Sequence, residues 1–203
     1  MSQALQWVLN APHLAVRQKK ELLEAFTGWE TSNKYAITDP NGQTVLMAGE
    51  VDRMIIAQFL GAARPFTIEL RDASGGVAMR VVRPWRWFFP EATITDAGGA
   101  PIGRIVRRWT FFSKLYDLFD GQGNFVGQLE GPFFRPWTFI VKDPSGAEVG
   151  RIEKKFGGLL KEMVTDADTF GVQFGPQMPP PFRALLLGAT FLVDFVHFES
   201  GPK

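Results

Sequence analysis

The chain contains no cysteine among its 203 residues, so it has no disulfide, no thiolate nucleophile and no cysteine-ligated zinc site. Histidine is scarce as well, since only His13 and His197 occur. One falls in a predicted loop and the other in an apolar segment, so neither a histidine-based catalytic triad nor a metal cage is spelled out. The stretch DGQGNFVG (120–127) has the wrong glycine spacing for a dinucleotide-binding loop. We therefore expect a protein that is not an enzyme and that needs no organic cofactor.

A strong charge and a long apolar run are missing too. The formal net charge of +1 gives no general attraction to polyanions, so nucleic acid is not an expected partner. The longest uncharged part of the C-terminal apolar segment runs from Ala184 to Val193, whereas a membrane-spanning helix needs about 20 residues. The first 20 residues lack the basic start and long apolar stretch of a signal peptide. We expect a protein that is cytoplasmic or peripheral on the cytoplasmic face of a membrane, with anchoring by the C-terminal helix as the weaker alternative.

What the chain does contain is one turn repeated five times. The pattern Asp-x-x-Gly occurs at Asp39, Asp72, Asp96, Asp120 and Asp143, each time between short stretches rich in Val, Ile, Phe and Thr. Asp at the first and Gly at the fourth position are typical of a type I turn, and such turns between β-prone stretches predict hairpins. A sixth, less regular hairpin is predicted over EMVTDADTFGVQF (162–174). Six hairpins supply about 12 strands, enough to close a barrel that has no exposed edge.

Residues 1–30 form a lead-in with two interpretations. Leu22, Leu23 and Phe26 fit one face of a helix. Leu14 and Val16 alternate with polar neighbours, which is equally typical of a first strand.

Residues 182–198 predict a helix about 25 Å long that is apolar nearly all round. Such a helix is buried, and the interior of a 12-stranded barrel is wide enough to hold it. The prediction is one domain over 1–203, mainly β, in which a closed antiparallel barrel encloses a C-terminal helix.

Five segments resemble the phospholipid scramblase family, in the order found there. They are ELLEAFTGWETSNKYAI (21–37), RPFTIEL (64–70), GGVAMRVVRPWRW (75–87), VGRIEKKFGGLLKEMVTDADTFGVQF (149–174) and LLLGATFLVDFVHFES (185–200). The most specific is TDADTFGVQF together with the helix behind it. The resemblance implies a tubby-like barrel, similar also to LURP-one-related proteins, with a hydrophobic helix threaded through it.

The resemblance also implies a function, namely calcium-dependent, energy-independent movement of phospholipids in both directions between leaflets. The family is tethered to membranes by palmitoylated cysteines. At the place of that cysteine cluster this chain has Arg83-Pro84 followed by four aromatic residues, Trp85, Trp87, Phe88 and Phe89. A thioester-linked anchor is therefore excluded. The alternatives to lipid movement are a soluble barrel that binds phospholipid or phosphoinositide, and a scaffold for a protein partner.

The calcium-binding segment of the family matches residues 166–177. In an EF-hand-like loop, Asp166 and Asp168 would be the first and third ligands, and Gly171 would stand at the sixth position. Phe170 at position five cannot bind a cation, and position 12 is Gln177 instead of an acid. We expect at best weak calcium binding, and the alternative is that both aspartates only cap the sixth hairpin turn.

Two links between predicted hairpins combine large rings with arginine and proline. RPWRWFFPE (83–91) carries Trp85, Arg86, Trp87, Phe88 and Phe89, and GPFFRPW (131–137) carries Phe133, Phe134, Arg135 and Trp137. Rings beside cations are typical of segments that lie in a membrane interface. The alternative is that these rings close the ends of the barrel and pack on the central helix.

A second group of basic residues lies on predicted strands and consists of Arg104, Arg107, Arg108, Arg151, Lys154, Lys155 and Lys161. If they gather on one wall, they form a groove for anionic lipid head groups, and otherwise they form a solvated surface. Because neighbours on a strand point to opposite faces and charges avoid the core, we expect most of them to point outward. Asp194 and His197 are neighbours on one helix turn, and we predict a polar pair at the barrel mouth.

Overall fold

The computed structural model describes residues 3–18, 34–51, 65–86, 90–155 and 169–198. They form two helices, α1 (Gln3–Leu9) and α3 (Pro180–His197), and twelve strands. The strands are β1 (His13–Gln18), β2 (Lys34–Thr38), β3 (Thr44–Glu50), β4 (Phe66–Arg71), β5 (Val77–Arg83), β6 (Glu91–Asp96), β7 (Pro101–Arg108), β8 (Ser113–Asp120), β9 (Phe125–Pro132), β10 (Thr138–Lys142), β11 (Glu148–Lys155) and β12 (Thr169–Phe174).

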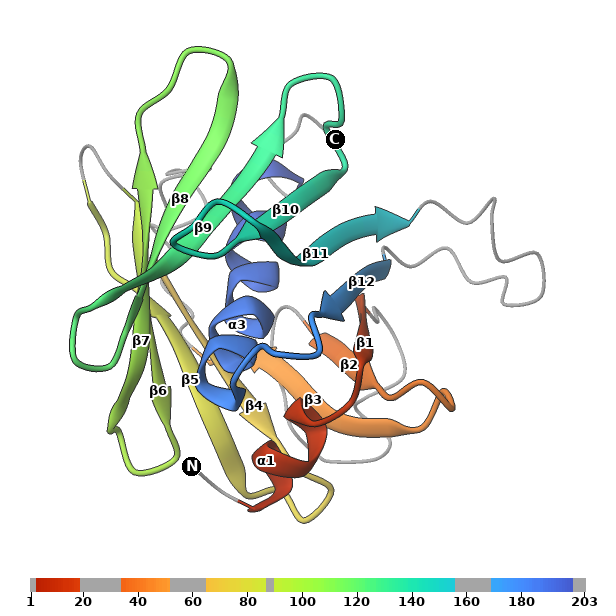
Figure 1. The fold of residues 1–203 in the computed structure, drawn as a ribbon. Coiled ribbons are helices and arrows are strands. Elements are labelled where there is room, and N and C mark those ends of the chain that lie inside the picture. Colours follow the sequence, from red (N-terminus) through yellow and green to blue (C-terminus); the bar gives the residue numbers. More distant parts are fainter. Residues whose placement is uncertain (1–2, 19–33, 52–64, 87–89, 156–168, 199–203) are drawn as a thin grey trace.

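The strands form a closed barrel in which each one pairs antiparallel with its neighbours in the chain. β1 closes the barrel, because it pairs with β2 on one side and with β12 on the other. Figure 1 shows α3 inside this ring of strands. The predicted fold, a mainly β barrel of twelve strands around a C-terminal helix, is confirmed.

The five repeated turns have one geometry. In each, the amide of the glycine donates to the carbonyl of the aspartate, and the glycine has φ between 82° and 87°. A type I turn followed by a residue in the left-handed region matches the twist of a hairpin, and glycine adopts that region without a steric penalty. The aspartate carboxylate accepts amide hydrogens from the second and fourth residues after it, as Asp143 does from Ser145 and Ala147.

The turn predicted for the sixth hairpin is placed wrongly in the sequence. Residues 169–171 were expected in that turn, yet they belong to β12. The reason is visible in the alternation, since Phe170, Val172 and Phe174 all point into the barrel and are buried. The strand expected over 162–165 lies outside the described residues, and β1 supplies the twelfth strand. The strand interpretation of Leu14 and Val16 is thereby confirmed.

The interior of the barrel is filled by α3. All fifteen residues from Phe182 to Val196 are buried. The walls leave room for the helix, because a Cβ on Gly103 of β7 would lie 2.7 Å from Leu185, and one on Gly188 of the helix would lie 2.7 Å from Ile94. Within the described parts of the chain, no helix is both long and apolar enough to cross a membrane.

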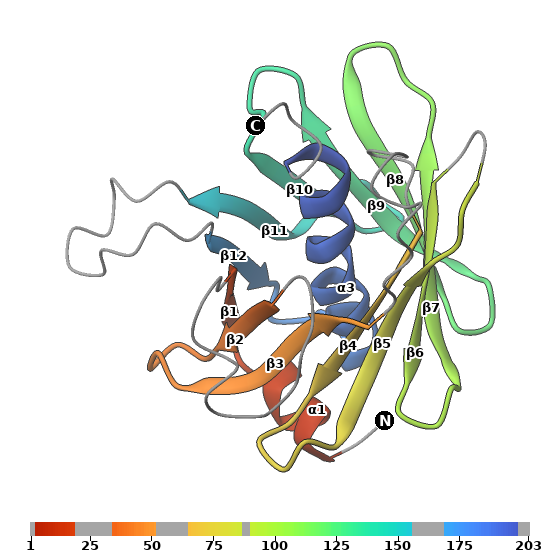
Figure 2. The same cartoon turned by 180° about the vertical axis from the view of Figure 1, so that it is seen from behind.

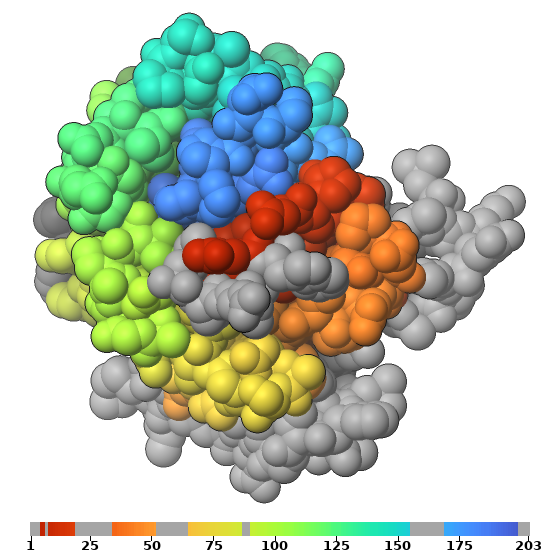
Figure 3. All heavy atoms as spheres, turned by 60° about the horizontal axis from the view of Figure 1, so that its bottom comes forward, coloured from red at the N-terminus to blue at the C-terminus, as the bar shows by residue number. Residues whose placement is uncertain are grey.

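Arg183 fastens the entry to the helix although it carries a charge. Its buried guanidinium donates to the carbonyls of Met178 at 2.7 Å, Leu9 at 2.8 Å and Gly175 at 3.1 Å. These bonds join the end of α1 to the segment that leads into α3. Figure 3 shows the two segments side by side at this end of the barrel.

The barrel has two different ends. We call the end that carries the five Asp-x-x-Gly turns the turn end. The links between hairpins, including residues 109–112 and 133–137, lie at the opposite end, which we call the loop end, and there α3 finishes (Figures 1 and 2). This follows from the antiparallel order, since every hairpin turn must lie at the same end when consecutive strands pair all the way round.

Candidate functional site

Exposed aromatic rings gather at the loop end. Three links contribute them, and we call the group the aromatic rim: Trp85, Trp109, Phe111, Phe112, Phe133, Phe134 and Trp137. Phe134 is 92% exposed, Phe112 83% and Phe111 78%. Large apolar side chains that are exposed together mark a surface that contacts a partner or a membrane.

The predicted aromatic residues divide between the two interpretations. Phe133 and Phe134 pack edge-on against each other, with ring centroids 5.4 Å apart, and remain exposed. Trp137 is partly used for closure, because its ring stacks at 5.4 Å on Phe198 just after α3. Trp85, Arg86 and Arg135 are exposed at the loop end, and Arg86 donates to Glu91. Trp87, Phe88 and Phe89 lie outside the described residues.

Our sequence prediction missed the third link of the rim. Trp109, Phe111 and Phe112 stand between β7 and β8, and Trp109 packs edge-on against Phe111 at 4.2 Å. The signal was present in RRWTFFSK (107–114), which combines rings and cations as the two predicted links do. It lacks the flanking prolines that drew attention to the other two.

Four cations face the inside of the barrel at the loop end, and we call them the basic mouth: Arg83, Arg107, Lys114 and Lys154. Each stands at the loop-end tip of a strand, and the alternation that buries Ile105 and Tyr116 turns Arg107 and Lys114 inward. The ammonium of Lys154 lies 4.2 Å from the centre of the Phe198 ring, and that of Lys114 lies 5.8 Å from it. Cations over aromatic faces are stabilised by the ring quadrupole.

The floor of the basic mouth is a neutral pair. The Tyr116 hydroxyl and His197 Nε2 are 2.7 Å apart, at the end of α3. Burial, and then the charges of Lys114, Arg107 and Arg83, lower the pKa of His197 to about 3, while burial raises the pKa of Tyr116 to about 12. The two groups therefore stay uncharged at neutral pH and do not compensate the cations above them.

The predicted pairing of Asp194 with His197 is replaced by two bonds to the wall. The Tyr35 hydroxyl donates to Asp194 at 2.8 Å, and the Tyr116 hydroxyl forms a hydrogen bond with His197. Both tyrosines come from strands far away in sequence, so spacing along the helix does not reveal them.

Two cations of the mouth have no anionic partner among the residues that the structure describes. Arg107 makes no side-chain ion pair there, and the contacts of Lys114 are to the rings of Phe139 and Phe198. Burial, and then the charge of Arg107, lower the pKa of Lys114. Cations that are close enough to repel each other are able to bind one anion together.

The outer wall differs from the mouth, since its cations are compensated. Arg104 lies 3.8 Å from Glu91, Arg108 lies 3.1 Å from Asp117, and Arg151 lies 2.7 Å from Glu148. The seven predicted basic residues thus do not gather on one wall, because Arg107 and Lys154 turn inward while these three point outward. The Lys155 side chain and Lys161 lie outside what the structure describes.

The predicted calcium ligands Asp166 and Asp168 also lie outside the described residues. Among the described residues, no group of three or more His, Asp or Glu side chains is placed to bind a metal ion. Calcium binding by Asp166 and Asp168 therefore stays a prediction.

Known proteins are similar in sequence to this chain over nearly its whole length. The family model described as Scramblase matches residues 1–200. Phospholipid scramblase 1 of Mus musculus is 34% identical over 208 residues, which cover 96% of this chain and 63% of that protein. Phospholipid scramblase 2 of Bos taurus is 32% identical, with 96% and 71% covered. Altered inheritance rate of mitochondria protein 25 of Saccharomyces cerevisiae is 27% identical, with 97% and 73% covered.

The chain spans a little less than two thirds of the length of the mouse relative. No solved structure matches the chain.

Proposed function

The chain belongs to the Scramblase family, and from that premise we propose that it acts at a membrane surface and moves phospholipids in both directions between the leaflets. The observation that carries the proposal is the grouping of the aromatic rim around the basic mouth at one end of the barrel. Rings of this kind partition into the interface between head groups and acyl chains.

In this proposal the basic mouth receives the phosphate of a lipid head group. Arg107 and Lys114 face inward, lack an anionic partner among the described residues, and lie between the loops that would enter the interface. Each cation near an anionic surface contributes about 1 kcal/mol to binding. The mouth alone therefore supports weak binding, and the rim has to supply the rest.

The filled interior limits how lipid can move. The helix residues Ala184 to Phe195 are all buried, and those other than Gly188 are at most 2% exposed, so a lipid that passed through the barrel would have to displace α3. A close-packed core does not open by small adjustments. We therefore place lipid movement outside the barrel, where rings of the rim that enter one leaflet disturb the packing of neighbouring lipids.

The test begins with flotation of the purified chain on vesicles of phosphatidylcholine alone or mixed with phosphatidylserine, with and without calcium. We expect flotation with the mixed vesicles, and loss of this preference in the variant Arg107→Met/Lys114→Met. Dependence on calcium that Asp166→Ala removes would support the calcium prediction.

Leaflet exchange is then measured with a fluorescent phospholipid and a quencher that reaches only the outer leaflet. Faster exchange supports lipid movement. A protein that floats without speeding exchange supports the second candidate, a barrel that binds lipid head groups or acts as a scaffold for a protein partner. A protein that stays at the bottom of every gradient overturns the membrane proposal.

A further inference from the structure

A large cavity lies at the turn end, away from the aromatic rim. Its volume is about 720 Å³, within the range of cavities that bind small molecules. Three adjacent hairpin turns form one side of it, and residues 177–182 with the start of α3 form the other. Figure 3 shows this segment (blue) next to the β8–β9 turn (green).

The cavity is mainly apolar in its depth. The segment before α3 and the helix itself contribute Met178, Phe182 and Leu185, and the strands contribute Ile102 and Val126. An apolar lining of this size favours an acyl or alkyl chain. Moving such a chain from water into the cavity gains a free energy of about 25 cal/mol per Å² of buried apolar surface.

The charged side chains among the described lining residues are all carboxylates. Three turn aspartates, Asp96, Asp120 and Asp143, are part of the lining, and none of the described lining residues is lysine, arginine or histidine. The largest effect on the pKa of Asp120 is the hydrogen bond from the Asn124 side chain, which lowers it. The hydrogen bond from the Ser145 side chain lowers the pKa of Asp143 in the same way, so both aspartates are ionised at neutral pH.

The two carboxylates differ in their bonding, since Asp120 Oδ2 accepts the Asn124 side chain at 2.9 Å whereas Asp143 keeps an acceptor oxygen. All bonds of Asp143 within the described chain go to Oδ1, which leaves Oδ2 for a ligand. Phe125 also lines the cavity and is 42% exposed. An aromatic face beside carboxylates is a suitable environment for an ammonium group.

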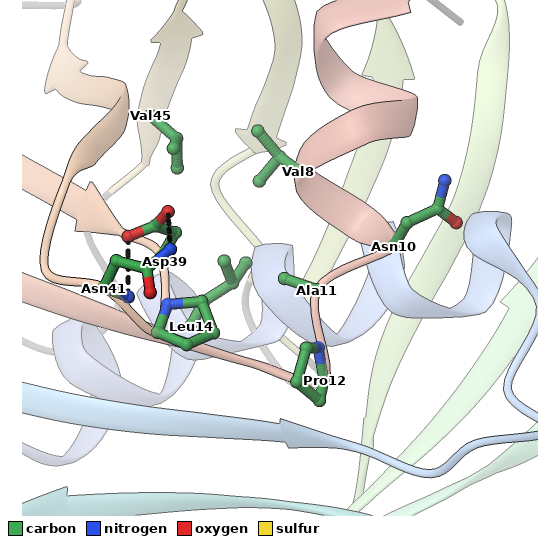
Figure 4. A pocket seen from close by; sticks show the side chains of 9 residues that line it. Val8, Asn10, Ala11, Pro12, Leu14, Asp39, Asn41 and Val45 are labelled. Atoms are coloured by element: carbon green, nitrogen blue, oxygen red, sulfur yellow. Dashed lines mark hydrogen bonds between the residues drawn. The ribbon is translucent and has the colours of Figure 1, made fainter.

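A second, smaller pocket at the turn end differs from this cavity in its volume and its carboxylates. It has a volume of about 260 Å³ and lies between Val8, Leu14 and Val45 (Figure 4). Its only carboxylate among the described lining residues is Asp39, whose Oδ1 accepts two backbone amides and whose Oδ2 accepts the Asn41 side chain. This pocket is smaller and has one carboxylate in its described lining, whereas the larger cavity has three, one of which, Asp143, keeps an acceptor oxygen.

We propose that the larger cavity is a binding site for a single-chain amphiphile with a positively charged ammonium head. The alkyl chain lies between the β7 and β9 walls and the start of α3, and the ammonium lies at Asp120 and Asp143. The site is independent of the proposed membrane function, since it is at the opposite end of the barrel. Its negative rim disfavours a phosphate-bearing lipid.

The probe is decyltrimethylammonium, measured by titration calorimetry below its micelle concentration against the full chain. Decyl maltoside serves as the neutral control, decyl sulfate as the anionic control and tetramethylammonium as the head without a chain. We expect the cationic amphiphile to bind most tightly and decyl sulfate least. Equal affinity for the cationic and neutral probes would overturn the assignment of the ligand class.

Two sets of variants locate the site. Asp120→Asn/Asp143→Asn preserves the oxygens that accept the backbone amides of the turns and removes both charges, together with the bond from the Asn124 side chain to Asp120. It should weaken binding of the cation about tenfold, as the loss of two partly exposed ion pairs would, and leave the neutral probe unchanged.

Ala100→Trp fills the cavity from an exposed position and should abolish binding. Ala97→Trp is its matched control, because it places the same ring in the same turn outside the lining. Thermal melting checks that all variants are folded. Binding that survives Ala100→Trp in a folded protein, or that Ala97→Trp removes equally, would overturn the site.

Discussion

The double variant Phe133→Ser/Phe134→Ser tests whether the aromatic rim enters a membrane. The two rings are 73% and 92% exposed in the free protein, so nearly all of their apolar surface is available for transfer into lipid. Full burial of a phenylalanine side chain is worth about 1.5–3 kcal/mol. Scaled by these exposures, loss of both rings should cost about 3 kcal/mol of membrane binding, which is roughly a hundredfold in the partition coefficient.

The assay is partitioning onto vesicles that contain phosphatidylserine, measured by sedimentation over a range of lipid concentrations. The matched control is Phe125→Ser, which removes a ring that is 42% exposed at the turn end and should leave partitioning unchanged. Stability gives a second control. Within the described residues the rings of Phe133 and Phe134 contact each other, so the free energy of unfolding should change by less than about 0.5 kcal/mol.

Two results would refute the reasoning. Partitioning of the double variant that equals the parent would show that the link at 133–137 does not enter the interface. An equal loss in Phe125→Ser would show that binding does not depend on the end of the barrel. A loss of about tenfold would instead indicate shallow insertion, in which only part of each ring leaves water.

The remaining predictions concern the core. Arg183→Met removes five bonds to carbonyls, three of them at 3.1 Å or less, and should lower the free energy of unfolding by about 3 kcal/mol, seen as a drop of roughly 6–12 °C in the melting midpoint; an unchanged midpoint would contradict the role of Arg183. Because the pKa of His197 is lowered to about 3 in the folded state, the unfolded state binds its proton first, and stability should fall by about 1.4 kcal/mol per pH unit below 6.5. His197→Gln should reduce this slope between pH 6.5 and 5 in denaturant titrations, and an unchanged slope would argue against a neutral His197. Gly103→Ala should destabilise by about 1–3 kcal/mol or more, because its Cβ would lie 2.3 Å from the Phe119 carbonyl oxygen and 2.7 Å from Leu185, whereas Gly98→Ala in an exposed turn should be nearly neutral.

Local features of the fold could be predicted because they depend on few neighbouring residues. Asp and Gly three positions apart suffice for a type I turn, and the aspartate bonds to its own turn. The apolar character of residues 182–198 predicts burial without reference to any partner. Residues 169–174 show the same alternation of buried side chains, yet their first part was assigned to a turn. The reason is that Asp166 and Asp168 resemble the aspartates of the other turns.

The candidate site could be predicted in part. The links with Trp85 and with Phe133 and Phe134 were expected either to lie in a membrane interface or to close the ends of the barrel, and the structure places both at the loop end with these rings exposed. The link with Trp109 and Phe111 carries the same signal and was overlooked. That all three share one end follows from consecutive antiparallel pairing, which the sequence suggests only once the barrel is assumed.

The sequence alone determined the turns, the strand-rich pattern, the buried helix and the absence of cysteine chemistry, because each depends on residue types and short spacings. Only the tertiary structure decided which cations face inward, since Arg107 and Arg108 are adjacent and a single step along a strand reverses the face. It also decided the partners of the helix: Tyr35 bonds to Asp194 across 159 positions, and Arg183 reaches Leu9 across 174. Such contacts form where segments that are far apart in the chain pack together, and short sequence patterns do not identify these partners.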